Sequence, residues 1–140
     1  MEIIRIVIPA IFIILEGIRD MKKRRISMIS VFLTGILGVF LSIPFLKDNF
    51  ISILGGIMIG IICLLVAKFS GEKIGYGDGW VLMVMGIYLG FRGNLYLISI
   101  SLFLASFVSV VLLISKKARR ETELPFVTFM IPGYFLLIVV

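Results

Sequence analysis

The sequence predicts an all-α integral membrane protein, a bundle of about six transmembrane helices. Of its 140 residues, 61% are hydrophobic, which leaves too little polar surface to coat a soluble globule of this size. Apolar runs recur along the whole chain, and most approach the ~20 residues that a helix needs to cross a ~30 Å hydrocarbon core. We therefore expect residues 1–140 to form one transmembrane domain without a separate soluble domain.

Six apolar runs can be laid out, at about residues 3–19, 26–46, 51–69, 79–91, 95–114 and 124–140. The first is expected to be retained, because basic residues follow it and no signal-peptide cleavage site lies at its end. The fourth would rise only about 20 Å at ~1.5 Å per residue, which is too short to cross. Either this helix starts below the membrane surface, with its glycine-rich entry buried in protein or lining a wet cavity, or its boundary lies a few residues away.

Basic residues fall in alternating connections between these runs, which predicts the orientation because such residues stay on the cytoplasmic side. One side holds Arg19, Lys22, Lys23, Arg24, Arg25, Lys68, Lys73, Lys116, Lys117, Arg119 and Arg120, and the other holds Arg5, Lys47 and Arg92. We expect a multi-pass protein of the plasma membrane with both termini outside and the basic loops in the cytoplasm. This topology accounts for the net charge of +6, so anionic membrane lipids are expected partners and nucleic acid is not.

The lack of histidine and the single cysteine exclude several kinds of catalytic and metal-binding site. The chain has no histidine, which excludes Ser-His and Cys-His mechanisms and histidine-containing zinc sites. The single cysteine, Cys63, lies inside the third apolar run and is interpreted as a small buried hydrophobe. No phosphate-binding glycine loop of the nucleotide-binding kinds is present. We expect neither a metal nor a cofactor.

Two of the acidic residues, Asp20 and Asp78, are predicted to meet at the cytoplasmic face, because one closes the first helix and the other opens the fourth. Two neighbouring carboxylates do not both ionise readily, so one can act as a base on water and the other as an acid toward a carbonyl. The glycines beside Asp78, namely Gly75, Gly77 and Gly79, lack a Cβ and allow a substrate strand or a helix to approach closely.

Each acidic residue also has a purely structural interpretation. Asp20 could end its helix by pairing with the basic cluster that follows, and Asp78 could be an N-cap. Glu16 lies one helical turn before Asp20 and on the same face. It could tune the local electrostatics, contact substrate, or pair with Arg19.

Three segments carry a resemblance to a known family. Residues 19–26 place an aspartate at a helix end before a basic run and an isoleucine, residues 75–78 read Gly-Tyr-Gly-Asp, and residues 123–129 contain Pro125-Phe126 at the start of the last run. In these segments and their order the chain resembles the type IV prepilin peptidases, integral-membrane aspartyl proteases of the GxGD class. It is similar to the short, core-only members, because it has one cysteine and no pair of Cys-x-x-Cys motifs.

The chain departs from the family pattern at two places. Ser27-Met28 stand where Pro-Asn is usual, and Val127-Thr128 stand where Gly-Pro is usual. A basic role often found just after the aspartate has no counterpart at Gly79-Trp80.

The resemblance implies an aspartic endopeptidase that removes the short basic leader of a prepilin-like protein at the cytoplasmic membrane face, without N-methyltransferase activity. Asp20 and Asp78 would be the catalytic pair. Residues assigned to substrate contact or local electrostatics are Glu16, Lys22, Lys23, Lys73, Pro125 and Phe126. A role in type IV pili, protein secretion or DNA uptake is left open, as is the oligomeric state.

One alternative function and one question of substrate contact accompany this hypothesis. Asp20 and Asp78 could instead form the cation or proton site of a small transporter or channel. Gly55, Gly56 and Gly60 could receive a substrate helix, although packing between the protein's own helices is the preferred interpretation.

Overall fold

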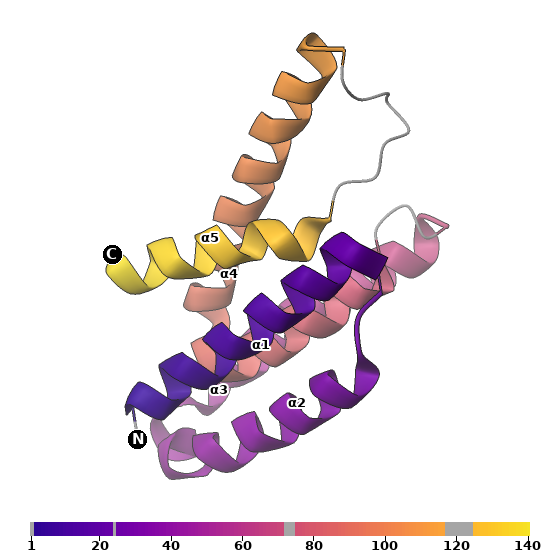
Figure 1. Ribbon diagram of the computed structural model, residues 1–140. Helices are drawn as coiled ribbons and strands as arrows, with labels where there is room; N and C mark the ends of the chain where they lie inside the picture. Colours follow the sequence, from indigo (N-terminus) through magenta and orange to yellow (C-terminus); the bar gives the residue numbers. More distant parts are fainter. Residues whose placement is uncertain (1, 24, 72–74, 117–124) are drawn as a thin grey trace.

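The computed structural model describes residues 2–23, 25–71, 75–116 and 125–140, and the structural statements below concern these residues. Its elements, in chain order, are α1 (Glu2–Lys23), α2 (Met28–Ser42), the 3-10 helix η1 (Ile43–Phe45), α3 (Leu46–Phe69), α4 (Tyr76–Ile114) and α5 (Phe126–Val139) (Figure 1). No strand occurs in this part of the chain, so the predicted all-α class is confirmed. Several residues named above lie outside the described part: Arg24, Lys73, Lys117, Arg119, Arg120, Glu123 and Leu124.

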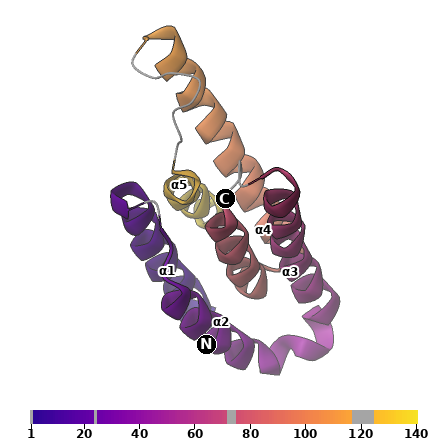
Figure 2. The same cartoon turned by 90° about the vertical axis from the view of Figure 1, so that its right-hand side faces the viewer.

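The helix α1 runs antiparallel to α2, and α3 runs antiparallel to the first part of α4. α3 lies along the first part of α4, and α5 lies against both α1 and α4. The end of α1, the end of α3 and the beginnings of α4 and α5 lie together at one end of the bundle in both views (Figure 2). We call this end, defined by residues 16–23, 25–27, 64–69, 75–79 and 125–128, the motif end.

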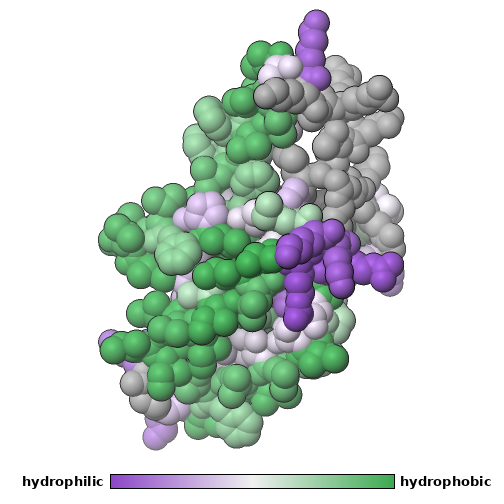
Figure 3. All heavy atoms as spheres, viewed as in Figure 1, coloured by the Kyte–Doolittle hydropathy of each residue, from purple (hydrophilic) through white to green (hydrophobic). Residues whose placement is uncertain are grey.

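Hydrophobic side chains cover most of the coloured surface on the face that Figure 3 shows, and many large hydrophobic residues of the described chain are exposed. Within the described residues, two segments are apolar and long enough to cross a membrane, Met28–Phe69 and Tyr76–Ile114, and Phe126–Val139 is a shorter apolar helix. An exposed apolar surface of this extent is what a bilayer covers. The arrangement as six spans stays a prediction, because the fourth and fifth predicted runs are joined in α4 and the second ends early, where Pro44 enters η1.

Gly90 breaks α4 at the junction of those two runs. Its backbone angles, φ 71° and ψ −172°, are open to glycine and closed to other residues. Three other helices supply partners for the backbone groups that the break exposes. The Arg5 guanidinium donates to the Tyr88 carbonyl at 3.4 Å, the Ser42 hydroxyl donates to the Ile87 carbonyl at 3.5 Å, and the Ser52 hydroxyl accepts from the Phe91 amide at 3.2 Å. Side chains of α1, α2 and α3 thus satisfy groups that lipid would leave without partners.

Glycines let α3 and α4 approach closely. A Cβ added at Gly60 would lie 2.5 Å from the backbone nitrogen of Met83, and one at Gly56 would lie 2.5 Å from the carbonyl oxygen of Gly86. A Cβ at Gly55 would lie 3.0 Å from Phe91. These contacts confirm that the three glycines serve packing between the protein's own helices.

Asn94, which lies in α4 beyond the break at Gly90, stabilises the interface between α3 and α4. Its fully buried amide donates to the Gly56 carbonyl at 3.0 Å and to the Leu82 carbonyl at 2.9 Å. The side chain therefore joins α3 to both parts of α4. No role had been predicted for Asn94 from sequence, although an amide at the edge of an apolar run is a signal that it is buried and bonded.

Candidate active site

Asp20 lies in the last turns of α1 and is only 9% exposed. Its Oδ2 accepts a hydrogen bond from the Val127 amide at 3.3 Å. That amide belongs to the first turn of α5, where backbone N–H groups have no partner within their own helix and attract negative charge. One turn earlier on α1, the Gly17 carbonyl accepts from the Thr128 hydroxyl at 3.1 Å. The beginning of α5 is therefore attached to α1 at the aspartate.

Asp78 lies in the first turn of α4, and its amide donates to the Gly75 carbonyl at 3.2 Å. Its carboxyl is partly buried, and the charge of Asp20 acts on it. The fold thus places two carboxyl groups, from α1 and α4, near enough to interact electrostatically although they are far apart in the sequence. Asp78 does sit at a helix N-terminus, as its structural interpretation expected, and the negative charge of Asp20 acts on it as well.

The glycines around Asp78 have different structural reasons. A Cβ on Gly77 would lie 2.5 Å from Cδ1 of Ile26, in the connection between α1 and α2, and one on Gly79 would lie 2.7 Å from Cγ of Leu64 on α3. A Cβ on Gly75 would make only ordinary contact, 3.5 Å from the Asp78 carboxylate oxygen. Neighbouring segments therefore approach closely at Gly77 and Gly79, whereas Gly75 is the N-cap residue of α4.

Glu16 is a fully buried carboxylate that fixes the α1–α2 connection. It accepts from the Ser27 amide at 3.1 Å and forms an ion pair with Arg19 at 3.2 Å. Arg19 also donates to the Ser30 hydroxyl, at 3.1 Å. Of the roles considered for Glu16, pairing with Arg19 is confirmed. By holding Ser27, the carboxylate places the adjacent Ile26 against Gly77.

Sequence reasoning had missed Ile26 and Ser27 as parts of this arrangement. The spacing of Glu16 and Arg19, three apart on a helix, was sufficient to suggest their ion pair. The contact between Ile26 and Gly77 joins the segment that follows Asp20 to the segment that precedes Asp78. No periodic pattern in the sequence predicts this contact.

The remaining predicted site residues lie at the rim. Lys22 and Lys23 are exposed and line an open pocket with Arg19 and Arg25, and neither Asp20 nor Asp78 lines it. Pro125 caps the beginning of α5, and Phe126 packs against the core. Both residues directly precede Val127, whose amide donates to Asp20. No group of three or more potential metal ligands occurs among the residues that the structure describes.

The type IV leader peptidase family has a sequence profile that matches residues 6–114 of this chain, most of its length. The chain belongs to the type IV leader peptidase family. The match contains both Asp20 and Asp78 and ends before α5, so Pro125 and Phe126 lie beyond it. No curated protein and no solved structure is significantly similar to the chain.

Membership in the type IV leader peptidase family supports a leader peptidase role for this chain. Together with the apolar helices, it indicates a peptidase that resides in a membrane.

Proposed function

We propose that this type IV leader peptidase family member is an aspartic endopeptidase whose catalytic pair is Asp20 and Asp78. The observation that supports the proposal is the electrostatic interaction between these two carboxyl groups at the motif end, where each lies beside the first turn of a helix. Such a pair can share one proton and work as general base and general acid together.

In this mechanism, one carboxylate takes a proton from a water molecule, which attacks the scissile carbonyl. The protonated partner donates its proton to the carbonyl oxygen, and a proton then passes to the departing amine. No covalent bond forms between enzyme and substrate. Asp20 is buried and Asp78 is partly buried, which limits the access of bulk water to the pair.

The proposed substrate is a prepilin-like protein with a short basic leader ahead of a hydrophobic helix. Its helix would lie in the bilayer beside the bundle, with the leader junction at the motif end on the cytoplasmic side. The proposed activity ends with cleavage and does not include methylation of the new N-terminus.

The test uses a pilin-like substrate co-expressed with the full chain. Asp20→Asn and Asp78→Asn should each abolish shortening of the substrate, while Asp48→Asn, an exposed acid at the opposite end of α3, should leave it unchanged. Membrane abundance and helical content of the variants show that they fold. Retained cleavage in either active-site variant would refute the catalytic pair.

The transporter hypothesis assigns the same two carboxylates to cation or proton binding. It predicts a flux in proteoliposomes that Asp20→Asn and Asp78→Asn both remove. Flux without any cleavage of a substrate would favour it over the peptidase.

A further inference from the structure

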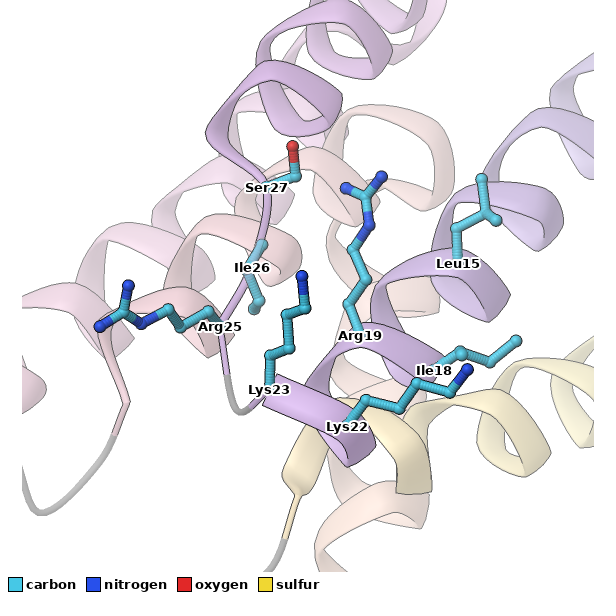
Figure 4. Close-up of a pocket in the computed structure, with 8 residues that line it drawn as sticks. All are labelled: Leu15, Ile18, Arg19, Lys22, Lys23, Arg25, Ile26 and Ser27. Atoms are coloured by element: carbon cyan, nitrogen blue, oxygen red, sulfur yellow. The ribbon is translucent and has the colours of Figure 1, made fainter.

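A cationic pocket lies at the motif end, where α1 ends and the chain turns into α2. It encloses about 510 Å³ and is lined by Leu15, Ile18, Arg19, Lys22, Lys23, Arg25, Ile26 and Ser27 (Figure 4). Four of these eight residues are basic and none is acidic. In Figure 4, Arg19 and Lys23 extend from α1 in the direction of Ser27, and Lys22 lies beside Ile18.

Most of this positive charge is not neutralised within the described part of the chain. Arg19 pairs with the buried Glu16. No acidic side chain among the described residues lies within ion-pair distance of Lys22, Lys23 or Arg25, and all three are exposed. Basic side chains gathered in this way bind phosphate groups well, because each offers N–H donors and positive charge.

Apolar surface leads up to the pocket along both helices. On α1, Ile11, Leu15 and Ile18 follow one another at helical spacing and are 53%, 48% and 43% exposed. On α2, Ile29 and Phe32 are 73% and 59% exposed. Figure 3 shows the resulting boundary, a hydrophilic patch over the end of α1 with hydrophobic surface beside it.

We propose that this pocket binds an anionic phospholipid, with the phosphate at Lys23, which lies between Lys22 and Arg25 in Figure 4, and an acyl chain along Leu15 and Ile18. A soluble anion would use the charges but not the apolar walls, and a basic peptide would be repelled by the four cations. Only an amphiphile with a negatively charged headgroup matches both the basic side chains of the pocket and the apolar side chains beside it. This inference does not depend on the proposed catalytic pair, because neither aspartate lines the pocket.

The pocket also shares residues with the structure around the active site. Arg19 pairs with Glu16, and Ile26 and Ser27 belong to the connection that lies against Gly77. A bound phospholipid would therefore contact the same connection from its outer side and hold it in place.

The test measures lipid retention by the purified full chain, titrated in detergent with phosphatidylglycerol or phosphatidylcholine and weighed intact by native mass spectrometry. We expect phosphatidylglycerol to be retained in preference. The double variant Lys22→Gln/Arg25→Gln should bind it about 30-fold more weakly, since each basic side chain near an anionic headgroup contributes about a fivefold factor. The control Lys47→Gln/Arg92→Gln, which also loses one exposed lysine and one exposed arginine, should bind it as the parent does.

A charge-preserving variant guards against loss of folding. Lys22→Arg/Arg25→Lys should retain phosphatidylglycerol as the parent chain does. Equal affinity for the two lipids, or equal weakening by the two charge-removing variants, would overturn the proposal. Displacement of the lipid by millimolar inorganic phosphate would also overturn it, because the site would then be one for free anions.

Discussion

At the scale of single residues, the buried Glu16 carboxylate connects α1 to the segment that leads into α2. It accepts from the Ser27 amide and from Arg19, and it has no exposed surface. A buried donor that loses its acceptor costs free energy of the order of a desolvated polar group, about 1–3 kcal/mol. Glu16 therefore supports the site by positioning the connection that carries Ile26.

We predict that Glu16→Ala lowers the free energy of unfolding in detergent by about 1–3 kcal/mol, because the partly buried Ser27 amide loses its acceptor and Arg19 loses its ion pair. Glu16→Gln keeps a carbonyl that can accept from Ser27 and should lose less. Chemical denaturation followed by circular dichroism measures both. Equal stability of the parent and the alanine variant would contradict this role.

Gly77 and Ile26 form a second residue-scale pair that a double variant can test. Gly77→Ala would place a Cβ 2.5 Å from Cδ1 of Ile26, and overpacking of this kind costs about 1–3 kcal/mol. We expect lower stability and slower cleavage of a co-expressed substrate. Ile26→Val removes the clashing methyl group, so Gly77→Ala/Ile26→Val should recover much of both.

Gly75→Ala is the matched control for stability, because its added Cβ makes only ordinary contact. Failure of Ile26→Val to improve the Gly77→Ala variant would show that the two residues do not act through this contact.

At the scale of elements, the break at Gly90 explains how a helix of 39 residues fits this bundle. The first part of α4 lies alongside α3, and the part after Gly90 runs in a different direction, as Figure 1 shows. The break also explains why the fourth apolar run predicted from sequence is too short to cross a membrane. That run begins at Tyr76 in the structure, and its end is set by a glycine with positive φ rather than by a polar loop.

Gly90→Ala should lower the free energy of unfolding by about 1–3 kcal/mol, because a residue with a Cβ is strained at these angles and the new atom would collide with the Ser52 hydroxyl. Gly35→Ala, in α2, is the control. Its Cβ would lie 3.7 Å from Val84, so the change should be neutral or stabilising by about 0.5–1 kcal/mol. Thermal unfolding in one detergent compares the two, and a Gly90→Ala protein as stable as Gly35→Ala would contradict the requirement for glycine.

At the scale of the whole molecule, the arrangement of charge leads to a prediction of orientation. Lys68, at the end of α3, lies at the motif end with Lys22 and Lys23, whereas Lys47 lies at the beginning of α3. The excess of basic residues at the motif end favours a cytoplasmic position for it.

In a Cys63→Ser background, we expect Lys47→Cys to react with a membrane-impermeant maleimide in intact cells. Lys68→Cys should react only after the cells are permeabilised. Cys63 packs against the core and is the only native thiol, so its replacement leaves one reactive site for each variant. Labelling of Lys68→Cys in intact cells would reverse the proposed orientation.

Much of this protein was predictable because the deciding information is local. Apolar runs and the absence of polar surface determined an all-helical chain, and the spacing of Glu16 and Arg19 suggested their pair. The positions of Asp20 and Asp78 next to connections on the same predicted side indicated that they could meet. Helix periodicity and charge patterns involve residues that are close in the sequence, so the helices and their ion pairs can be predicted from the sequence alone.

Only the tertiary structure decided which segments come into contact at the motif end. The Val127 amide on Asp20, the Ile26 side chain on Gly77 and the three side chains around the Gly90 break each join parts of the chain that are distant in sequence. Such contacts depend on how closely helices approach and at what angle they cross, and these quantities follow from the packing of the whole bundle. The sequence by itself thus determined the helices and the two candidate acids, and the packing decided how both acids are held.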